Sequence, residues 1–257
     1  MIGFDYLGKM GRLCNQMFQY AAVKGIAANR GFEFCIPYPS GNNEWEDHQL
    51  FNCFDIDVVC GYIMHDYVTE SGFEFDENLF NNVPDKTSLV GYFQTEKYFT
   101  HIKNQIKKDF KFKDYIYDAC NEAVDNIKNP ISLHIRRTDF ISNPNHYSLP
   151  IEYYVEALKY FDSSREVIVF SDDTKWCEEQ KIFSSDRFLI SQEQDNYHDL
   201  CLMTLCEDHI IANSSFSWWG AWLAENNRVI APKDWFGNSN NKHLNIEDII
   251  PERWIKI

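Results

Sequence analysis

Two adjacent arginines, Arg136 and Arg137, follow the apolar run 131–135, and Asp139 comes shortly after them. A short β-branched run behind Pro130 is typical of a buried strand, and open α/β sheets bind ligands at the carboxyl ends of their strands. Arginine is always charged, and its planar fork of donors fits a phosphate group. The pattern favours an anion site for a phosphorylated ligand. The alternative is that one arginine only pairs with Asp139 while the other is solvated.

A second apolar run, 167–170, ends in a similar way at Ser171, Asp172 and Asp173. Acidic groups at that edge can hold ribose hydroxyls or the edge of a purine. The alternative is that Ser171 or Asp172 caps the helix that follows. Adjacent aspartates point in different directions, so this pair does not predict a metal site.

A third apolar run, 209–212, is followed by small polar residues and then by an aromatic helix. Hydroxyls and free backbone N–H groups at a helix N-terminus form an anion site that the helix dipole reinforces. Helix capping is compatible with that role. The residues concerned are Asn213, Ser214, Ser215 and Phe216. The tryptophans that follow, Trp218, Trp219 and Trp222, are expected in the core.

The second half of the chain predicts a parallel sheet that positions these three strand ends. Short apolar strands alternate regularly with helical segments there, as in sheets covered on both faces. We expect strands near 131–135, 167–170, 188–190, 209–212 and 228–230, and helices near 151–161, 173–180, 197–207 and 216–226. This half therefore reads as a Rossmann-like domain.

The first half predicts a smaller and less regular α/β domain. Its expected strands lie near 2–6, 32–36 and 88–93, its helices near 16–29, 96–110 and 114–127, and its irregular region at 40–85 has short strands around 57–63. The loop Gly8-x-x-Gly11 is neither a dinucleotide fingerprint nor a P-loop. We place the domain boundary at Asn129-Pro130, which gives domains 1–129 and 130–257.

The composition narrows the class of function. With 39 acidic against 24 basic residues, the net charge of −15 argues against a nucleic-acid surface, so an anion site has to be a local cluster. The eight cysteines show no C-x-x-C pair and no Cys/His ligand spacing, which argues against zinc, and we expect their thiols to be reduced, as in a cytosolic protein. We see no signal peptide and no transmembrane run, and expect a cytoplasmic protein.

Four stretches resemble the motifs of the α-1,2-fucosyltransferase family, glycosyltransferase family 11, in the family's order. They are Gly11-Arg12-Leu13-Cys14-Asn15-Gln16-Met17-Phe18-Gln19-Tyr20-Ala21, His134-Ile135-Arg136-Arg137-Thr138-Asp139, Phe170-Ser171-Asp172-Asp173 and Asn213-Ser214-Ser215-Phe216-Ser217-Trp218-Trp219-Gly220. The family usually has glycine where this chain has Cys14 and Thr138. The chain is also short for the family, and the missing length is expected in acceptor-facing loops.

The resemblance implies a GT-B architecture, in which two Rossmann-like domains face each other across a cleft. It implies a galactoside 2-α-L-fucosyltransferase that uses GDP-fucose, inverts the anomeric carbon and requires no metal or other cofactor. The acceptor is then the 2-hydroxyl of a terminal β-galactoside in a surface glycan or oligosaccharide. Alternatives are a fucosyltransferase of another linkage or acceptor, and a non-catalytic sugar-nucleotide-binding module. An enzyme of polysaccharide assembly could also act at the inner face of the membrane, attached peripherally.

The chemistry of such a reaction suggests roles for individual residues. Arg136 is expected to stabilise the charge that grows on the β-phosphate, with Arg137 helping or bracing the loop. Asp139 is either the general base or the group that orients Arg136, and the second role is favoured because pairing with arginine lowers basicity. His146 and Glu152 are further candidates for the base.

Other residues are expected to bind GDP-fucose or line the cleft. Asp172 and Asp173, beside Ser171, are assigned to the guanosine; Ser214 and Ser215, between Asn213 and Phe216, to the diphosphate. His134 is either a ligand contact or a buried structural residue. Gly11, Asn15 and Gln16 face the cleft from the N-terminal domain, or else Asn15 and Gln16 cap and pack their helix.

Overall fold

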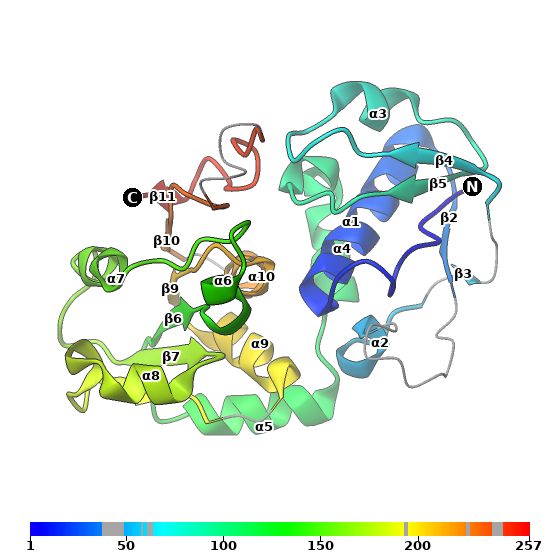
Figure 1. The fold of residues 1–257 in the computed structure, drawn as a ribbon. Helices are drawn as coiled ribbons and strands as arrows, with labels where there is room; N and C mark the ends of the chain where they lie inside the picture. Colours follow the sequence, from blue (N-terminus) through cyan, green and yellow to red (C-terminus); the bar gives the residue numbers. More distant parts are fainter. Residues whose placement is uncertain (38–48, 58, 61–63, 193–194, 225–226, 238–243) are drawn as a thin grey trace. The chain divides into compact units, whose positions relative to one another are not determined.

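The computed structural model describes residues 1–37, 49–57, 59–60, 64–192, 195–224, 227–237 and 244–257 (Figure 1). The chain divides into two compact units. Unit 1 comprises Met1–Lys113 and Leu244–Pro251, and unit 2 comprises Asp114–His243 and Glu252–Ile257. Each unit contains a parallel sheet with helices, so the expected α/β class and the Rossmann-like units of the GT-B type are confirmed.

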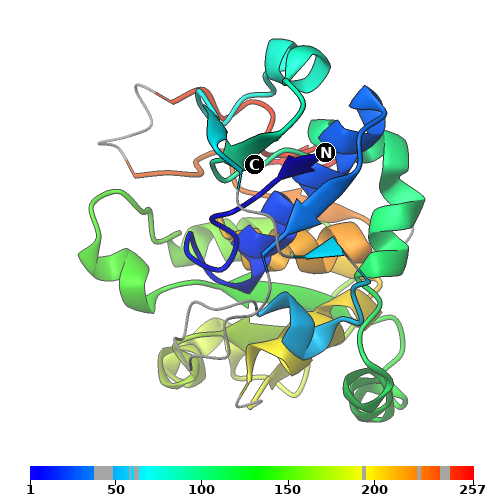
Figure 2. The same cartoon turned by 90° about the vertical axis from the view of Figure 1, so that its right-hand side faces the viewer.

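Unit 1 contains a five-stranded sheet of order β3-β2-β1-β5-β4 in which every pairing is parallel. Its strands are β1 (Ile2–Gly3), β2 (Phe34–Ile36), β3 (Val59–Cys60), β4 (Asp66–Thr69) and β5 (Thr87–Val90). Its helical elements are α1 (Leu13–Arg30), α2 (Leu50–Cys53), α3 (Glu77–Asn82), η1 (Glu96–Tyr98), η2 (Thr100–Ile102) and α4 (Lys103–Asp109). Figure 2 gives a second view of these elements.

Helix α1 supplies much of the core of unit 1. Most of its residues are buried, and it ends at Arg30, one residue beyond the predicted 16–29. Gly31 is the C-cap, and its φ of 67° is the left-handed conformation that glycine adopts readily. Gly25, in the middle of the helix, permits a close approach: a Cβ there would lie 2.0 Å from the carbonyl oxygen of Tyr98. This helix therefore packs tightly on η1, which follows β5.

Unit 2 contains a six-stranded parallel sheet of order β11-β10-β9-β6-β7-β8. Its strands are β6 (Ile131–Ile135), β7 (Val167–Ser171), β8 (Phe188–Ile190), β9 (Asp208–Ile210), β10 (Val229–Ala231) and β11 (Ile255–Lys256). Its helical elements are α5 (Asp114–Val124), α6 (Thr138–Ser142), α7 (Ile151–Leu158), α8 (Thr174–Glu179), η3 (Lys181–Phe183), α9 (Asn196–Leu205) and α10 (Ser215–Leu223).

Strand β6 lies near the middle of this sheet, between β7 and β9. All five of its residues are buried, which agrees with a strand covered on both faces. Register places Ile135 opposite Ser171 of β7, so these two strands end side by side. The sheet thereby brings the sequences after β6 and β7 to one edge.

Helix α10 carries the aromatic core that the sequence predicts. Trp218 and Trp219 are fully buried, and Trp222 is almost so. Gly220 lies against α9, because a Cβ at this position would come within 2.8 Å of the Cβ of Met203. The absence of a side chain at Gly220 therefore lets α9 and α10 pack closely.

The structure differs from the predictions in several places. The division falls at Lys113/Asp114 instead of 129/130, because α5 packs on α9 of unit 2. The helix expected over 96–110 is three short elements, η1, η2 and α4. The sequence did not predict β4, α2, α3, α6 or β11, which are short or polar. Part of the expected 57–63 region lies outside the described residues.

Candidate active site at the carboxyl edge of the second sheet

The guanidinium of Arg136 lies between two carboxylates just after β6. Its Nη2 is 2.8 Å from Asp139 Oδ1, and its Nη1 is 3.3 Å from Asp172 Oδ2. The guanidinium carbon lies 5.7 Å from the centroid of the Phe140 ring. A guanidinium has five N–H donors in one plane. The two carboxylates therefore fix its orientation and leave N–H groups for an incoming anion.

Asp172 connects the ends of β6 and β7. Its Oδ1 accepts the backbone N–H of Arg137 at 2.9 Å, and its Oδ2 accepts both the backbone N–H of Thr138, at 3.1 Å, and the Thr138 hydroxyl. Together with its contact to Arg136, these bonds fix the turn at which the chain leaves β6. The hydroxyl of Thr138 is a contact that glycine could not make.

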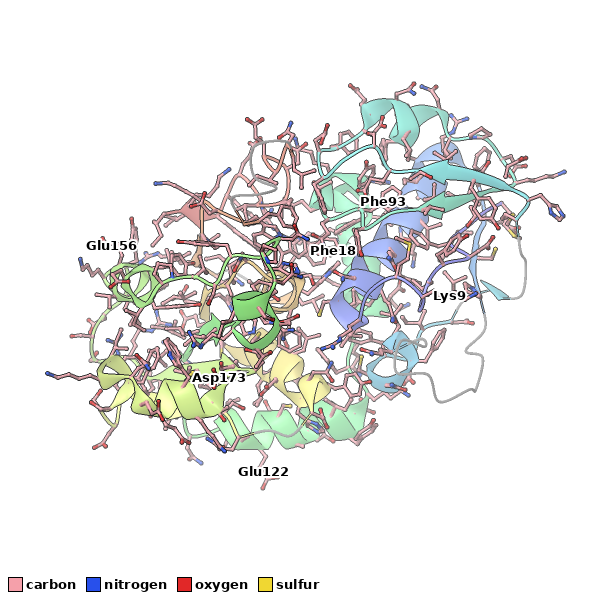
Figure 3. All side chains as sticks on the ribbon, in the orientation of Figure 1. Lys9, Phe18, Phe93, Glu122, Glu156 and Asp173 are labelled. Carbon is pink, nitrogen blue, oxygen red and sulfur yellow. The ribbon has the colours of Figure 1, made fainter. Side chains whose placement is uncertain are left out.

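Asp173 caps α8, at whose start Figure 3 labels it. Its Oδ1 accepts the backbone N–H of Trp176 at 3.2 Å, so the alternative in which Ser171 or Asp172 caps this helix is wrong. Its Oδ2 is 3.1 Å from Nε of Arg137. The Arg137 guanidinium also lies 3.9 Å from the centroid of the Trp176 ring. Through these contacts Arg137 holds the ends of β6 and β7 together.

The contact and the pKa of Asp139 fit a residue that orients Arg136. Burial raises its pKa, but the hydrogen bond and positive charge of Arg136 outweigh burial, and the net pKa lies below the usual value. A carboxylate with a lowered pKa is a weak base. The geometry therefore supports the orienting alternative that the sequence favours.

His134 is nearly inaccessible, with 4% of its surface exposed. Its Nδ1 lies 2.9 Å from the Ser217 hydroxyl, and its ring centroid is 5.5 Å from that of Phe216. Burial, with a smaller effect of Arg136, lowers its pKa to about 3, so the imidazole is neutral at ordinary pH. Of the two roles left open for His134, its Nδ1 contact fits the buried, hydrogen-bonded one.

The N-terminus of α10 lies at the same edge of the sheet, after β9. Ser214 is the N-cap, and its hydroxyl accepts the backbone N–H of Phe216 at 3.3 Å, as the capping alternative predicts. Ser214, Ser215 and Phe216 are partly exposed, and Asn213 is buried. The two serines are therefore the accessible polar groups of this turn.

Asn213 does not point its amide nitrogen at this edge. Its Nδ2 donates to the backbone carbonyls of Tyr147 and Trp235, each at 2.8 Å, and so joins two loops. Its Oδ1 is buried and has no hydrogen-bond partner among the described residues. Its contacts are those of a residue that holds loops together, a role that the sequence did not reveal. Its predicted role in donor binding stays a prediction.

The predicted residues of unit 1 lie around the start of α1. Gly11 has a φ of 84°, and a Cβ there would lie 2.4 Å from the Asn15 amide nitrogen. Asn15 Oδ1 accepts from Gln94 Nε2 at 2.9 Å. Gln16 is fully buried, and its amide donates to the Gly11 carbonyl at 3.3 Å. These contacts match the packing alternative for Gln16, and the ligand-facing roles stay predictions.

A pocket of about 300 Å³ lies at the ends of β10 and β11. Its lining residues are Tyr147, Leu149, Pro150, Glu152, Tyr153, Glu156, Pro232, Lys233, Asp234 and Ile257. Glu152, the other candidate base, is an exposed residue that lines this pocket, and among the described residues it has no contact with Arg136. The described residues contain no group of three or more His, Cys, Asp or Glu side chains arranged to hold a metal ion. They also contain no helix with the length and apolarity needed to span a membrane.

The fold and this edge define a Rossmann-like α/β protein with two paired arginines at the carboxyl edge of its second sheet. The chain belongs to glycosyl transferase family 11, whose model matches residues 6–257. Over 294 residues it is 33% identical to the O-antigen biosynthesis glycosyltransferase WbnK of Escherichia coli, covering 93% of this chain and 97% of that protein. It is 34% identical over 198 residues to an alpha-1,2-colitosyltransferase of Escherichia coli, covering 72% and 67%.

More distant relatives extend the comparison. The galactoside alpha-(1,2)-fucosyltransferase 1 of Alouatta caraya is 22% identical over 258 residues, which cover 85% of this chain and 65% of that protein. The solved fucosyltransferase NodZ from Bradyrhizobium superposes with a TM-score of 0.59 at 12% identity, covering 95% and 97%. POFUT1 in complex with GDP superposes with a TM-score of 0.56 at 13% identity, covering 90% and 96%. At these identities the two structures show the fold alone.

Proposed function

We propose that this protein is an inverting glycosyltransferase that moves L-fucose from GDP-fucose to the 2-hydroxyl of a terminal β-galactoside. The observation that carries the proposal is Arg136, fixed by Asp139 and Asp172 at the carboxyl edge of β6. The family membership and the relatives named for α-1,2 transfer support the reaction class.

The chemistry of the step explains why a fixed arginine is useful. When the bond from the sugar to the nucleoside diphosphate breaks, negative charge grows on the β-phosphate while the sugar becomes oxocarbenium-like. Preorganised donors aimed at that charge lower the barrier without reorganising during the step. In this proposal Arg136 supplies the main charge, and Ser214, Ser215 and the N-terminus of α10 supply further donors. The reaction then needs no metal ion.

The guanosine is assigned to the β7 end, beside Ser171. Asp172 and Asp173 already bind backbone and side-chain donors of the protein. In this assignment, the lone pairs that remain on the two carboxylates accept hydrogen bonds from the guanosine.

A second donor is favoured by one observation, the 34% identity to an alpha-1,2-colitosyltransferase. Colitose is the 3-deoxy form of L-fucose, so a site for one sugar differs from a site for the other at a single hydroxyl. A GDP-activated colitose is therefore the competing donor.

The setting proposed for this reaction is the assembly of a bacterial-type surface polysaccharide, in the cytoplasm or at the inner face of the membrane. The 33% identity to an O-antigen biosynthesis glycosyltransferase supports that setting.

The decisive experiment is an acceptor screen with both donors, followed by NMR of the product linkage. We expect an α-1,2 bond to a terminal galactose and faster transfer from GDP-fucose than from the colitosyl donor. Faster colitosyl transfer would replace the donor assignment, and another linkage would replace the acceptor assignment. Donor binding without hydrolysis or transfer to any acceptor would support a binding module instead. Activity that a chelator abolishes and magnesium restores would refute the metal-independent step.

A further inference from the structure

His146 and Arg136 contact the same phenyl ring, that of Phe140, although they are ten positions apart in the sequence and the short helix α6 lies between them. Its ring stacks on Phe140 of α6, with centroids 4.3 Å apart and planes 6° from parallel. The same Phe140 ring has the Arg136 guanidinium carbon 5.7 Å from its centroid. One phenyl ring thus positions both the arginine and the imidazole.

The segment that carries His146 is fixed from several directions. The backbone N–H of His146 donates to the Asn143 carbonyl at 3.0 Å. The Asn213 amide holds the Tyr147 carbonyl at 2.8 Å, and the N–H of Gly237 donates to the Asn145 carbonyl at 3.1 Å. A Cβ on Gly237 would lie 2.9 Å from the His146 carbonyl oxygen, so the two loops touch. The backbone that carries the imidazole is therefore held on both sides.

The ring nitrogens of His146 are available for a substrate. In the part of the chain that the structure describes, neither nitrogen has a hydrogen-bond partner, and the side chain is partly exposed. Other histidine rings are engaged: those of His134 and His209 bond to Ser217 and Ser132, and that of His198 pairs with an aspartate. Among the described histidines, His146 alone combines a ring stacked on Phe140, the residue that Arg136 also contacts, with unoccupied ring nitrogens.

The charges around His146 keep its ring neutral. Burial lowers its pKa most, the negative charge of Asp139 opposes that shift, and the positive charge of Arg136 adds to it, with a net lowering from 6.5. At neutral pH the imidazole is therefore unprotonated and has a lone pair. A base with a pKa near or somewhat below the working pH is effective in proton transfer.

We infer that His146 is the general base that takes the proton from the acceptor hydroxyl. The inference rests on the proposed function and deepens it. The competing groups are less suited: Asp139 is committed to Arg136 at 2.8 Å, and His134 is buried with its Nδ1 on Ser217.

The step balances without any further reactant. The acceptor oxygen attacks the anomeric carbon and forms the new glycosidic bond. The bond between that carbon and the β-phosphate oxygen breaks, and its electron pair leaves with GDP. The hydroxyl proton passes to a ring nitrogen of His146, which later releases it to water.

The test uses the whole chain and two substitutions. His146→Phe keeps a planar ring for the stack on Phe140 and has no nitrogen, and His146→Gln keeps polarity without basicity. His65→Phe is the matched control, because His65 is exposed and belongs to unit 1. The measurements are kcat of fucosyl transfer from acid to mildly basic pH, and the Kd of GDP by calorimetry.

We expect both His146 variants to lose about 10²–10⁴-fold in kcat, the usual contribution of a general base, with the GDP Kd unchanged. The wild type loses kcat at acid pH as the imidazole is protonated, and that acid limb disappears in both variants. The control keeps the wild-type rate and profile.

Three results would overturn the inference: wild-type kcat in the variants, an unchanged acid limb, or a GDP Kd that weakens in step with kcat. The proposed function is tested separately, by the activity of the wild-type protein. A wild-type protein that transfers neither sugar to any galactoside refutes the proposed function, whereas an active wild type with active His146→Phe refutes only the base.

Discussion

Arg136 and Asp172 form an ion pair of 3.3 Å between the ends of two neighbouring parallel strands. The same carboxylate accepts the backbone N–H groups of Arg137 and Thr138. The position of the arginine therefore depends on the backbone turn after β6 as well as on its own side-chain contacts. Substitutions of Arg136, Asp139 and Asp172 should therefore have different effects.

Replacing Arg136 by lysine tests whether the guanidinium fork matters beyond its charge. Lysine keeps one positive charge but cannot contact Asp139, Asp172 and a phosphate in one plane. We expect transfer to slow by about 10²–10³-fold and GDP to bind more weakly. Arg187→Lys is the matched control, because Arg187 precedes β8 at the opposite edge of the sheet. Near-normal turnover of purified Arg136→Lys would remove Arg136 from the diphosphate site.

Replacing Asp139 by asparagine separates orientation from proton transfer. If Asp139 orients Arg136, the variant loses donor affinity and kcat together. Its effect should then be smaller when Arg136 is already alanine, because the two side chains are in contact. The measurements are GDP titration and transfer kinetics on both single variants and the double variant. A fall in kcat alone, with unchanged GDP affinity, would identify Asp139 as the base in place of His146.

Replacing Asp172 by asparagine weakens the junction between β6 and β7. One oxygen is lost, so either the Arg137 N–H or the Thr138 N–H and hydroxyl lose their acceptor. We expect about 1–3 kcal/mol less stability in urea unfolding, together with weaker GDP binding. Glu122→Gln, on the exposed face of α5, is the control and should change neither. Unchanged stability would mean that Asp172 serves the ligand alone.

Two buried histidines predict acid sensitivity of the fold. Burial is the main cause that lowers the pKa of both His134 and His209 to about 3, below the 6.5 of an unfolded histidine. The unfolded chain therefore binds more protons, and stability falls as pH drops below 6.5 towards 3, by about 1.4 kcal/mol per pH unit for each histidine. We expect His209→Asn to remove one histidine's share of that slope in urea unfolding, while His65→Asn retains it. Equal slopes in His209→Asn and the wild type would contradict this.

Glu70 predicts the opposite pH dependence in unit 1. Its carboxylate accepts the backbone N–H groups of Tyr92 and Phe93, at 2.7 and 2.9 Å. Burial nevertheless raises its pKa to about 7 from 4.5, so the folded state binds the extra proton in that window. Relative to Glu70→Gln, the wild type should lose stability as pH rises from 4.5 to 7. A difference between the two proteins that stays constant across this range would show that Glu70 ionises normally.

Strands β6, β7, β9 and β10 of unit 2 were predictable because buried parallel strands are short, apolar and β-branched. The run 131–135 forms β6 at the predicted residues, and the arginines follow it at the edge as expected. The tryptophans of α10 pack in the core for the same reason, since large aromatic side chains are mostly buried.

The hydrogen-bond partners of the residues at the carboxyl edge of the unit 2 sheet were not predictable from the sequence. Asp172 pairs with backbone N–H groups 34 and 35 positions away, a choice made by strand register and not by local composition. Asn213 bonds two loops whose proximity appears only when the sheet has formed. The short helix α6, which begins at Thr138, gives no periodic signal in five residues. Helix α5 packs with unit 2 although it precedes the expected boundary, because its partner α9 comes much later in the chain.

The return of the chain to unit 2 at Glu252–Ile257 has a consequence for how this protein can be divided. After His243 the chain contributes Leu244–Pro251 to unit 1 and then supplies β11, which pairs with β10. Neither unit is therefore a continuous segment, and no single cut yields an intact Rossmann-like half. A shortened gene that stops before Glu252 leaves β10 with an unpaired edge, which is a template for aggregation. Domain exchange with relatives therefore requires three junctions, one after Lys113, one before Leu244 and one after Pro251.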